Sequence, residues 1–273
     1  MKRIKLTVAY DGTNYSGWQI QPTAPTIEQV LDQAIEHITG ERLHVTGASR
    51  TDAGVHAMGN VAVFDTESTI PGERWSYAIN RFLPEDVCVQ ESREVKTDFH
   101  PRHCNTEKTY EYQVLNATFP NPKLRNYVWN VPGNLNIDTM REAASVLIGE
   151  HDFKSFCCVR TQVESTVRTV YSIEIEEQKC ENLGLNQNDS SIGSDSDSLK
   201  RIIRFRIRGN GFLYNMVRII AGTLIQVGKG QKSVKDVEEM LEAKNRCAAG
   251  QTAPPQGLTL MKIDYIDGDD AAV

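Results

Sequence analysis

Apolar residues recur along the chain at spacings that identify single strands and helices. Residues 3–10 alternate between apolar and polar side chains, which predicts a half-buried strand that ends at an Asp-Gly turn. Thr26 is placed to cap the N-terminus of a helix, with Gln29 completing a capping box and Gly40 ending the helix. Apolar positions between these ends follow the helical repeat, so one face of this helix is expected to be buried.

The same patterns predict two consecutive sets of elements. In the first half we expect short strands near residues 43–47 and 60–65, a helix near 75–83 and a strand near 87–91. In the second half we expect strands near 107–115, 166–175, 201–208 and 258–265, and helices at 138–148, at 213–227 and from Ser233 onward. Each half then follows the ferredoxin-like order β-α-β-β-α-β. The predicted fold class is α+β, with two ferredoxin-like halves at 1–103 and 104–273.

Composition narrows the class of protein. The chain has 273 residues, of which 40% are hydrophobic and 24% charged, as in soluble globular proteins. No apolar run approaches the length of a membrane span, so no membrane partner is expected. The six cysteines form no Cys-x-x-Cys pair and no secretory signal is apparent, which indicates reduced thiols in the cytoplasm.

The net charge of −6 argues against a nucleic-acid partner only if the charge is spread evenly. Acidic residues are concentrated in residues 176–199 and in the tail 266–273, which leaves the rest of the chain close to neutral. Such a body can still carry a basic groove, because phosphate contact depends on local Lys and Arg side chains. Residues 178–198, rich in Asn, Ser and Asp, are expected to form a mobile hairpin insertion that is dispensable.

Candidate chemistry lies in the segment Ser-Arg-Thr-Asp-Ala-Gly-Val-His-Ala at residues 49–57. It gathers Arg50, Asp52 and His56 around Gly54 between two predicted strands, a combination that packing does not require. The alternative explanation is local: Asp52 forms an Asx-turn and Gly54 supplies a positive φ. The segment alone does not decide between a catalytic loop and an ordinary turn.

Other clusters offer weaker signals. His100, His103 and Cys104 are possible metal ligands, but no second cluster with matching spacing supports a zinc site. His56 has no Ser or Cys partner at a nucleophile elbow, so no catalytic triad is indicated. We expect no metal and no cofactor.

Five stretches, taken together, resemble the TruA family of tRNA pseudouridine synthases. They are YDGTNYSGWQ (10–19), ASRTDAGVHA (48–57), KTYEY (108–112), GFLYNMVR (211–218) and APPQGL (253–258). They occur in the family's order over nearly the whole chain, and the set is far more specific than any one of them. One departure is Ser49, where many relatives have Gly, so the start of the loop is expected to differ slightly.

The resemblance implies roles for the matched residues. Asp52 would be the catalytic residue, and Arg218 would lie beside it and favour its ionised form. Tyr110 would stack on the target base and offer its hydroxyl for proton transfer, although a strand tyrosine is otherwise an ordinary core residue. Arg50 would fill the vacated base stack or hold a phosphate, and His56 would hold the loop or touch a phosphate. The resemblance also implies that Leu258 lines the pocket.

The resemblance also implies a substrate and an assembly. The substrate would be a uridine at positions 38 to 40 of the tRNA anticodon stem-loop. The antiparallel sheets of the two halves would form a central RNA-binding cleft, and the protein would work as a homodimer.

The expected reaction breaks the N1–C1′ bond of uridine, turns the base and rejoins it through C5. It requires a carboxylate beside the sugar, and the sequence leaves open whether Asp52 attacks C1′ or takes a proton from C2′. The main alternative is a non-catalytic RNA-binding module on the same fold. A glycosidase is less well supported because it would need a second carboxylate, and no loop acid in the first half is an obvious partner.

Overall fold

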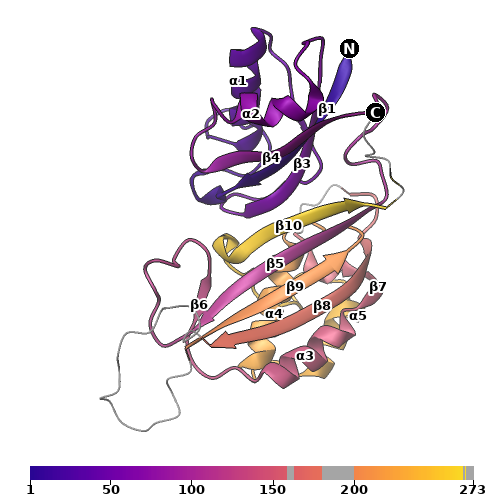
Figure 1. Ribbon diagram of the computed structural model, residues 1–273. Coiled ribbons are helices and arrows are strands. Elements are labelled where there is room, and N and C mark those ends of the chain that lie inside the picture. Colours follow the sequence, from indigo (N-terminus) through magenta and orange to yellow (C-terminus); the bar gives the residue numbers. More distant parts are fainter. Residues whose placement is uncertain (159–162, 180–199, 267, 269–273) are drawn as a thin grey trace. The chain divides into compact units, whose positions relative to one another are not determined.

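The computed structural model describes residues 1–158, 163–179, 200–266 and 268. Two compact units make up the chain (Figure 1): unit 1 comprises Met1–Thr109 and Thr259–Val273, and unit 2 comprises Tyr110–Leu258. The halves expected from the sequence, 1–103 and 104–273, differ from these units because the C-terminal residues group with unit 1. The described residues form a mixed α/β structure of ten strands, mostly antiparallel, and five α-helices.

Unit 1 is a sheet with two helices. Its elements are β1 (Lys2–Tyr10), α1 (Ile27–Thr39), β2 (Thr46–Gly47), β3 (His56–Thr66), α2 (Trp75–Ile79), β4 (Val87–Val95) and most of β10 (Leu258–Tyr265), with 3-10 turns η1 (Gly12–Asn14) and η2 (Gly72–Arg74). The strand order is β4-β1-β3-β10, and β2 also pairs with β3. β1 is antiparallel to β3 and β4, β2 is antiparallel to β3, and β10 is parallel to β3.

The helix predicted from Thr26 to Gly40 is confirmed. The Thr26 hydroxyl accepts from the Gln29 N–H at 3.4 Å, and Gly40 ends α1 with a φ of 75°. The apolar stripe of α1 is buried, as is Trp75 of α2, whose ring meets Phe64 of β3 edge-on at 5.0 Å.

The strand predicted near 60–65 is longer than expected and begins at His56. His56 and Asn60 are polar but almost wholly buried, at 5% and 0% exposure, because neighbouring strands flank β3 on both sides. Because the residues at its start are polar, the alternation of apolar and polar side chains does not predict the first part of this strand.

Unit 2 is a sheet with three helices on one face (Figure 1). Its elements are most of β5 (Thr106–Asn116), then β6 (Trp129–Val131), α3 (Ile137–Val146), β7 (Gly149–Asp152), η3 (Phe153–Phe156), β8 (Val167–Lys179), β9 (Arg201–Gly209), α4 (Met216–Gly228), α5 (Val234–Ala243) and η5 (Pro255–Gly257). The strand order is β5-β9-β8-β7, and β6 is parallel to β5.

Most elements predicted for the second half are observed, including the last strand, Leu258–Tyr265. The short strands β6 and β7 were not predicted, and Ile148, the last residue of the helix predicted at 138–148, follows α3 and is 40% exposed. Helix α4 begins later than expected because Asn215 adopts a φ of 64°. Apart from Gln178 and Lys179, which end β8, the predicted insertion at 178–198 lies outside the described residues.

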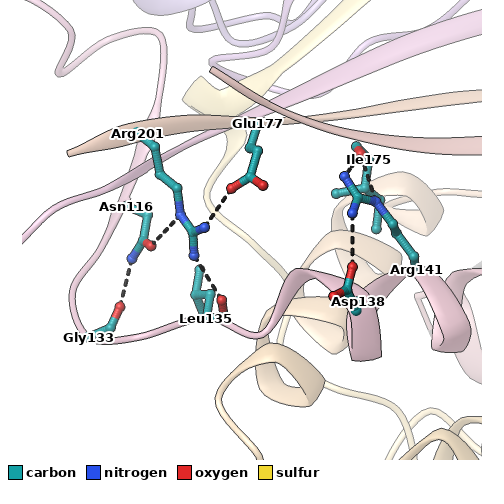
Figure 2. Close-up of polar contacts among 8 residues, drawn as sticks. All are labelled: Asn116, Gly133, Leu135, Asp138, Arg141, Ile175, Glu177 and Arg201. Atoms are coloured by element: carbon teal, nitrogen blue, oxygen red, sulfur yellow. Dashed lines mark hydrogen bonds and ion pairs between the residues drawn. The ribbon is translucent and has the colours of Figure 1, made fainter. Parts of the chain in front are cut away.

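A buried arginine at the start of β9 ties this strand to the rest of unit 2 (Figure 2). The Arg201 guanidinium donates to the Asn116 side chain at 3.1 Å, to the Leu135 carbonyl at 2.8 Å and to Glu177 at 2.6 Å. Asn116 in turn donates to the carbonyl of Gly133 at 2.8 Å. This network satisfies a charge that is only 8% exposed.

None of the helices in the described ranges is both long enough and apolar enough to cross a membrane.

Candidate active site

The segment that carries Asp52, residues 49–55, forms a loop between β2 and β3 in unit 1, and we call it the Asp52 loop. Gly54 has a φ of 75°, as a tight turn there requires. The Val55 N–H donates to the Asp52 carbonyl at 3.1 Å and closes the turn. The Asp52 side chain is half-buried, and Ala53 beside it is exposed. The positive φ expected at Gly54 is present, in a turn that the Asp52 backbone carbonyl closes and that places the Asp52 side chain at the surface of the unit.

Buried polar groups beneath the loop fix its backbone. The hydroxyls of Tyr10 and Thr51 are 2.7 Å apart, and the Asn60 amide donates to the Tyr10 hydroxyl at 3.3 Å. The same amide donates to the Ser49 carbonyl at 3.0 Å, while the Ser49 N–H donates to the Asn60 oxygen at 3.3 Å. We call these four residues the Tyr10 network. It holds both the first residue of the loop and the residue directly before Asp52.

The N-terminal motif at residues 10–19 packs directly on the loop. The Trp18 N–H donates to the Thr51 carbonyl at 3.1 Å, and the Gly54 N–H donates to the Tyr15 carbonyl at 3.2 Å. Gly17 has a φ of 92°, and a Cβ there would lie 2.5 Å from the Thr51 oxygen. Only glycine permits this approach, so two motifs distant in sequence form one rigid body.

Arg50 and His56 lie at opposite extremes of exposure. Arg50 is exposed at the surface of unit 1. His56 is buried, its Nδ1 accepts from the Gly12 N–H at 3.0 Å, and that nitrogen also lies 3.1 Å from a carboxylate oxygen of Asp11. Of the two roles expected for His56, these contacts support holding the loop rather than touching a phosphate.

The matched stretches of unit 2 contact one another through a few residues. Tyr110 on β5 is 9% exposed, and its ring meets Phe212 edge-on at 5.2 Å. Arg218 on α4 donates to the Ala253 carbonyl and to the Asn215 side chain, both at 2.8 Å. Leu258, 5% exposed, begins β10 shortly after Ala253.

Tyr112, two residues after Tyr110, is a structural residue of this region. Its hydroxyl donates to the Pro254 carbonyl at 2.8 Å, and burial raises its pKa well above the usual range. It therefore remains protonated and fastens the segment Ala253–Leu258 to β5. The hydroxyl also explains why the stretch 253–258 keeps a fixed course before the last strand.

The cluster His100, His103 and Cys104 forms a turn after β4. The two imidazoles stack with their centroids 3.8 Å apart, and the Cys104 thiol donates to the His100 carbonyl at 3.2 Å. Within the described ranges no group of three or more His, Cys, Asp or Glu side chains is arranged to hold a metal ion. Tyr10 and Asn60 were not predicted as site residues; their signal in the sequence was a polar group on the buried face of a strand.

Comparison with known proteins identifies relatives along nearly the whole chain. The sequence matches the family described as tRNA pseudouridine synthase over residues 6–103 and 143–266, ranges that include Asp52 and Arg218 but not Tyr110. It is 44% identical to tRNA pseudouridine synthase A of Thermoanaerobacter sp. (strain X514), covering 97% of this chain and 100% of that protein. It is 42% identical to tRNA pseudouridine synthase A of Acetivibrio thermocellus, again covering 97% and 100%.

A solved structure described as "Crystal Structure of a Cbf5-Nop10-Gar1 Complex" matches 94% of this chain and 56% of that one. The sequence identity is 14% and the TM-score is 0.27, a likeness too slight to bear on the fold.

Proposed function

Because the chain belongs to the tRNA pseudouridine synthase family, we propose that it isomerises uridine to pseudouridine in tRNA with Asp52 as the catalytic carboxylate. The observation that carries the proposal is the Asp52 loop, a half-buried carboxylate on a backbone held by the Tyr10 network and by residues 10–19. A side chain that acts on one sugar atom needs such fixed geometry, because small displacements are costly in rate.

The reaction is balanced without any redox partner. The N1–C1′ bond breaks, the base turns, a C5–C1′ bond forms, and the proton leaves C5 while N1 gains one. Asp52 acts either as nucleophile at C1′ or as base at C2′, and both roles need the ionised carboxylate. Arg218 has the role of favouring that ionised form, since a guanidinium near a carboxylate stabilises its charge.

The remaining matched residues bind the target nucleotide in this proposal. Tyr110 contacts the base and offers its hydroxyl near C5, and its contact with Phe212 gives the ring a fixed orientation. Leu258 supplies an apolar wall, Arg50 contacts the RNA, and His56 keeps the loop in place through Gly12. A uridine in a duplex must first be extruded to reach these groups.

The experiment that tests the proposal is Asp52→Asn, with tritium release from C5-labelled uridine in tRNA as the readout. We expect release to fall to background while tRNA affinity and thermal stability stay unchanged, because an amide is neither nucleophile nor base. Asp98→Asn, at an exposed carboxylate of unit 1, is the matched control and should release tritium normally. Normal release by the Asp52 variant would refute Asp52 as the catalytic carboxylate, and no release by the wild-type protein would favour the rival proposal, a non-catalytic RNA-binding module.

The substrate position follows from the family resemblance, and we propose a uridine at positions 38 to 40 of the anticodon stem-loop. Two ferredoxin-like halves would bind the RNA in a central cleft through its backbone and shape. Neighbouring uridines could then be modified without recognition of the base sequence. Binding should weaken steeply as salt increases. Pseudouridine mapping of tRNA from cells lacking the protein checks the position, and losses confined to ribosomal RNA would contradict it.

We further propose that the protein works in the cytoplasm as a homodimer. A tRNA body is long relative to one such protein, and a second copy would extend the surface that holds it. Light scattering at micromolar concentration should give twice the chain mass of 30.6 kDa. A monomer mass with full activity would contradict the assembly.

A further inference from the structure

A hollow in unit 1 borders the Asp52 loop and brings together three separate segments of the chain. Arg50 comes from the loop itself, Trp18 from the N-terminal motif and Arg102 from the turn after β4. Glu28 on α1 also lines it. Of these residues, only Arg50 was a predicted site residue.

Both guanidiniums at the hollow are exposed, and among the described residues neither has a side-chain hydrogen bond or an ion pair. Glu28 forms no ion pair with either of them in the described part of the chain, and one of its carboxylate oxygens accepts from the Ile20 N–H at 2.9 Å. The indole N–H of Trp18 is buried and has no hydrogen-bond partner in the described part of the chain. The hollow thus combines two exposed cations and one buried donor against a single carboxylate.

The turn that carries Arg102 is anchored by buried neighbours. Phe99 is 3% exposed, and its ring meets Tyr265 edge-on at 5.1 Å. Arg3 donates to the Phe99 carbonyl at 2.7 Å, and the Tyr265 hydroxyl donates to the Pro101 carbonyl at 3.0 Å. These contacts fix the backbone on the N-terminal side of Arg102.

Histidines fix the backbone at Arg102 itself. The Arg102 N–H donates to Nδ1 of His100 at 3.2 Å, and the His103 N–H donates to the His100 carbonyl at 3.2 Å. Burial, followed by the nearby charge of His103 and Arg102, lowers the pKa of His100, so its Nδ1 is free of a proton and can accept at neutral pH. The cluster that resembles a metal site is therefore a turn that displays Arg102.

We propose that Arg50 and Arg102 bind one phosphate of the tRNA backbone in this hollow, next to the target uridine. This inference rests on the proposed function and deepens it, because it adds Arg102 to the substrate-binding residues and assigns a phosphodiester to Arg50. Guanidinium groups bind phosphate oxygens bidentately, and two of them match one phosphate better than they match a neutral base edge. Because Arg50 lies two residues before Asp52, a phosphate bound there sets which nucleotide of the RNA strand reaches Asp52.

The test compares Arg102→Gln with Arg81→Gln, an exposed arginine of unit 1 that does not line the hollow. For each full-length protein, tRNA affinity is measured at several salt concentrations, and the rate of tritium release is measured at saturating tRNA. We expect Arg102→Gln to weaken affinity about five- to tenfold at low salt and to flatten the salt slope by about 0.7 to 0.9. Its melting temperature should stay at the wild-type value.

A second variant is expected to change tRNA affinity in the opposite direction. Glu28→Gln removes the carboxylate that lines the hollow yet keeps an acceptor for the Ile20 N–H, so tRNA affinity should rise about twofold. Arg102→Gln with the affinity and slope of Arg81→Gln would overturn the proposal, and so would an unchanged affinity with a reduced rate at saturation. Because wild-type activity and the Asp52→Asn result do not depend on this comparison, failure here leaves the proposed function standing.

Discussion

Tyr10→Phe is the sharpest test of how the Asp52 loop is held. Tyr10 is 4% exposed, and its hydroxyl lies 2.7 Å from the Thr51 hydroxyl and accepts from the Asn60 amide at 3.3 Å. The substitution removes one oxygen and leaves the ring in place. Asn60 keeps its bond to the Ser49 carbonyl, so the group most affected is the hydroxyl of Thr51, which is 7% exposed.

The magnitude follows from these contacts. A buried partner left without its hydrogen bond costs about 1–3 kcal/mol, and the short Tyr10–Thr51 contact dominates, which gives about 2 kcal/mol for the pair of bonds. For a chain of this size that corresponds to a fall in melting temperature of about 4–8 °C. Since Thr51 directly precedes Asp52, the carboxylate should also lose its fixed position, and the rate at saturating tRNA should fall about tenfold or more.

The assay pairs thermal unfolding with single-turnover tritium release, and tRNA affinity is measured in parallel. Affinity should not change, because the Tyr10 hydroxyl is buried. Tyr77→Phe, at a tyrosine that is 70% exposed, makes the same chemical change without removing a buried contact and should match wild type. A Tyr10→Phe protein that melts several degrees lower yet keeps the wild-type rate would refute the idea that this network positions Asp52.

Two further predictions concern stability. Arg201→Met should lower the free energy of unfolding by about 2–3 kcal/mol in chemical denaturation, because the buried Asn116 and Leu135 oxygens lose their donor. The matched variant Arg141→Met removes the contacts of a half-exposed side chain (Figure 2) and should lower the free energy of unfolding by less than about 1 kcal/mol. A hydrogen bond from Thr166, with a smaller contribution from Lys244, lowers the pKa of Asp152 below 3.8, so its stabilisation is present above that pH and is lost as the pH falls through the lowered value. Melting curves from pH 7 to pH 2 should show a smaller acid-induced loss for Asp152→Asn, and an unchanged pH dependence would contradict this assignment.

Local signals in the sequence were sufficient to predict elements that carry their own capping residues. Helix α1 has its cap at Thr26 and its stop at Gly40, and α5 has a capping box between Ser233 and Asp236, so both were located correctly at their N-termini. Strand β3 was shortened in the prediction because His56 and Asn60 are polar yet buried. Their burial depends on neighbouring strands, which no window along one segment contains.

The site was predictable as a set of motifs but not as a set of contacts. The sequence identified the Asp52 loop and residues 10–19 separately, and nothing in their spacing indicates that the Thr51 carbonyl approaches Gly17. Arg102 was overlooked because the histidines around it suggested metal ligands. The distinguishing feature is the burial of Phe99 and Pro101, which turns the segment into a fixed support for one exposed arginine.

The pairing of the last strand explains why the C-terminal residues group with unit 1. Thr259 and Leu260 of β10 pair in parallel with His56 and Ala57, the first residues of β3 after the Asp52 loop. The loop is therefore bounded on its C-terminal side by a strand start that needs β10 as a neighbour, while Gly12 fixes His56 through Nδ1. Leu258, assigned to the pocket by resemblance, is the residue directly before this pairing. A chain segment more than 200 positions away thus limits the movement of the residues next to Asp52, and the final strand supports the Asp52 loop as well as the core.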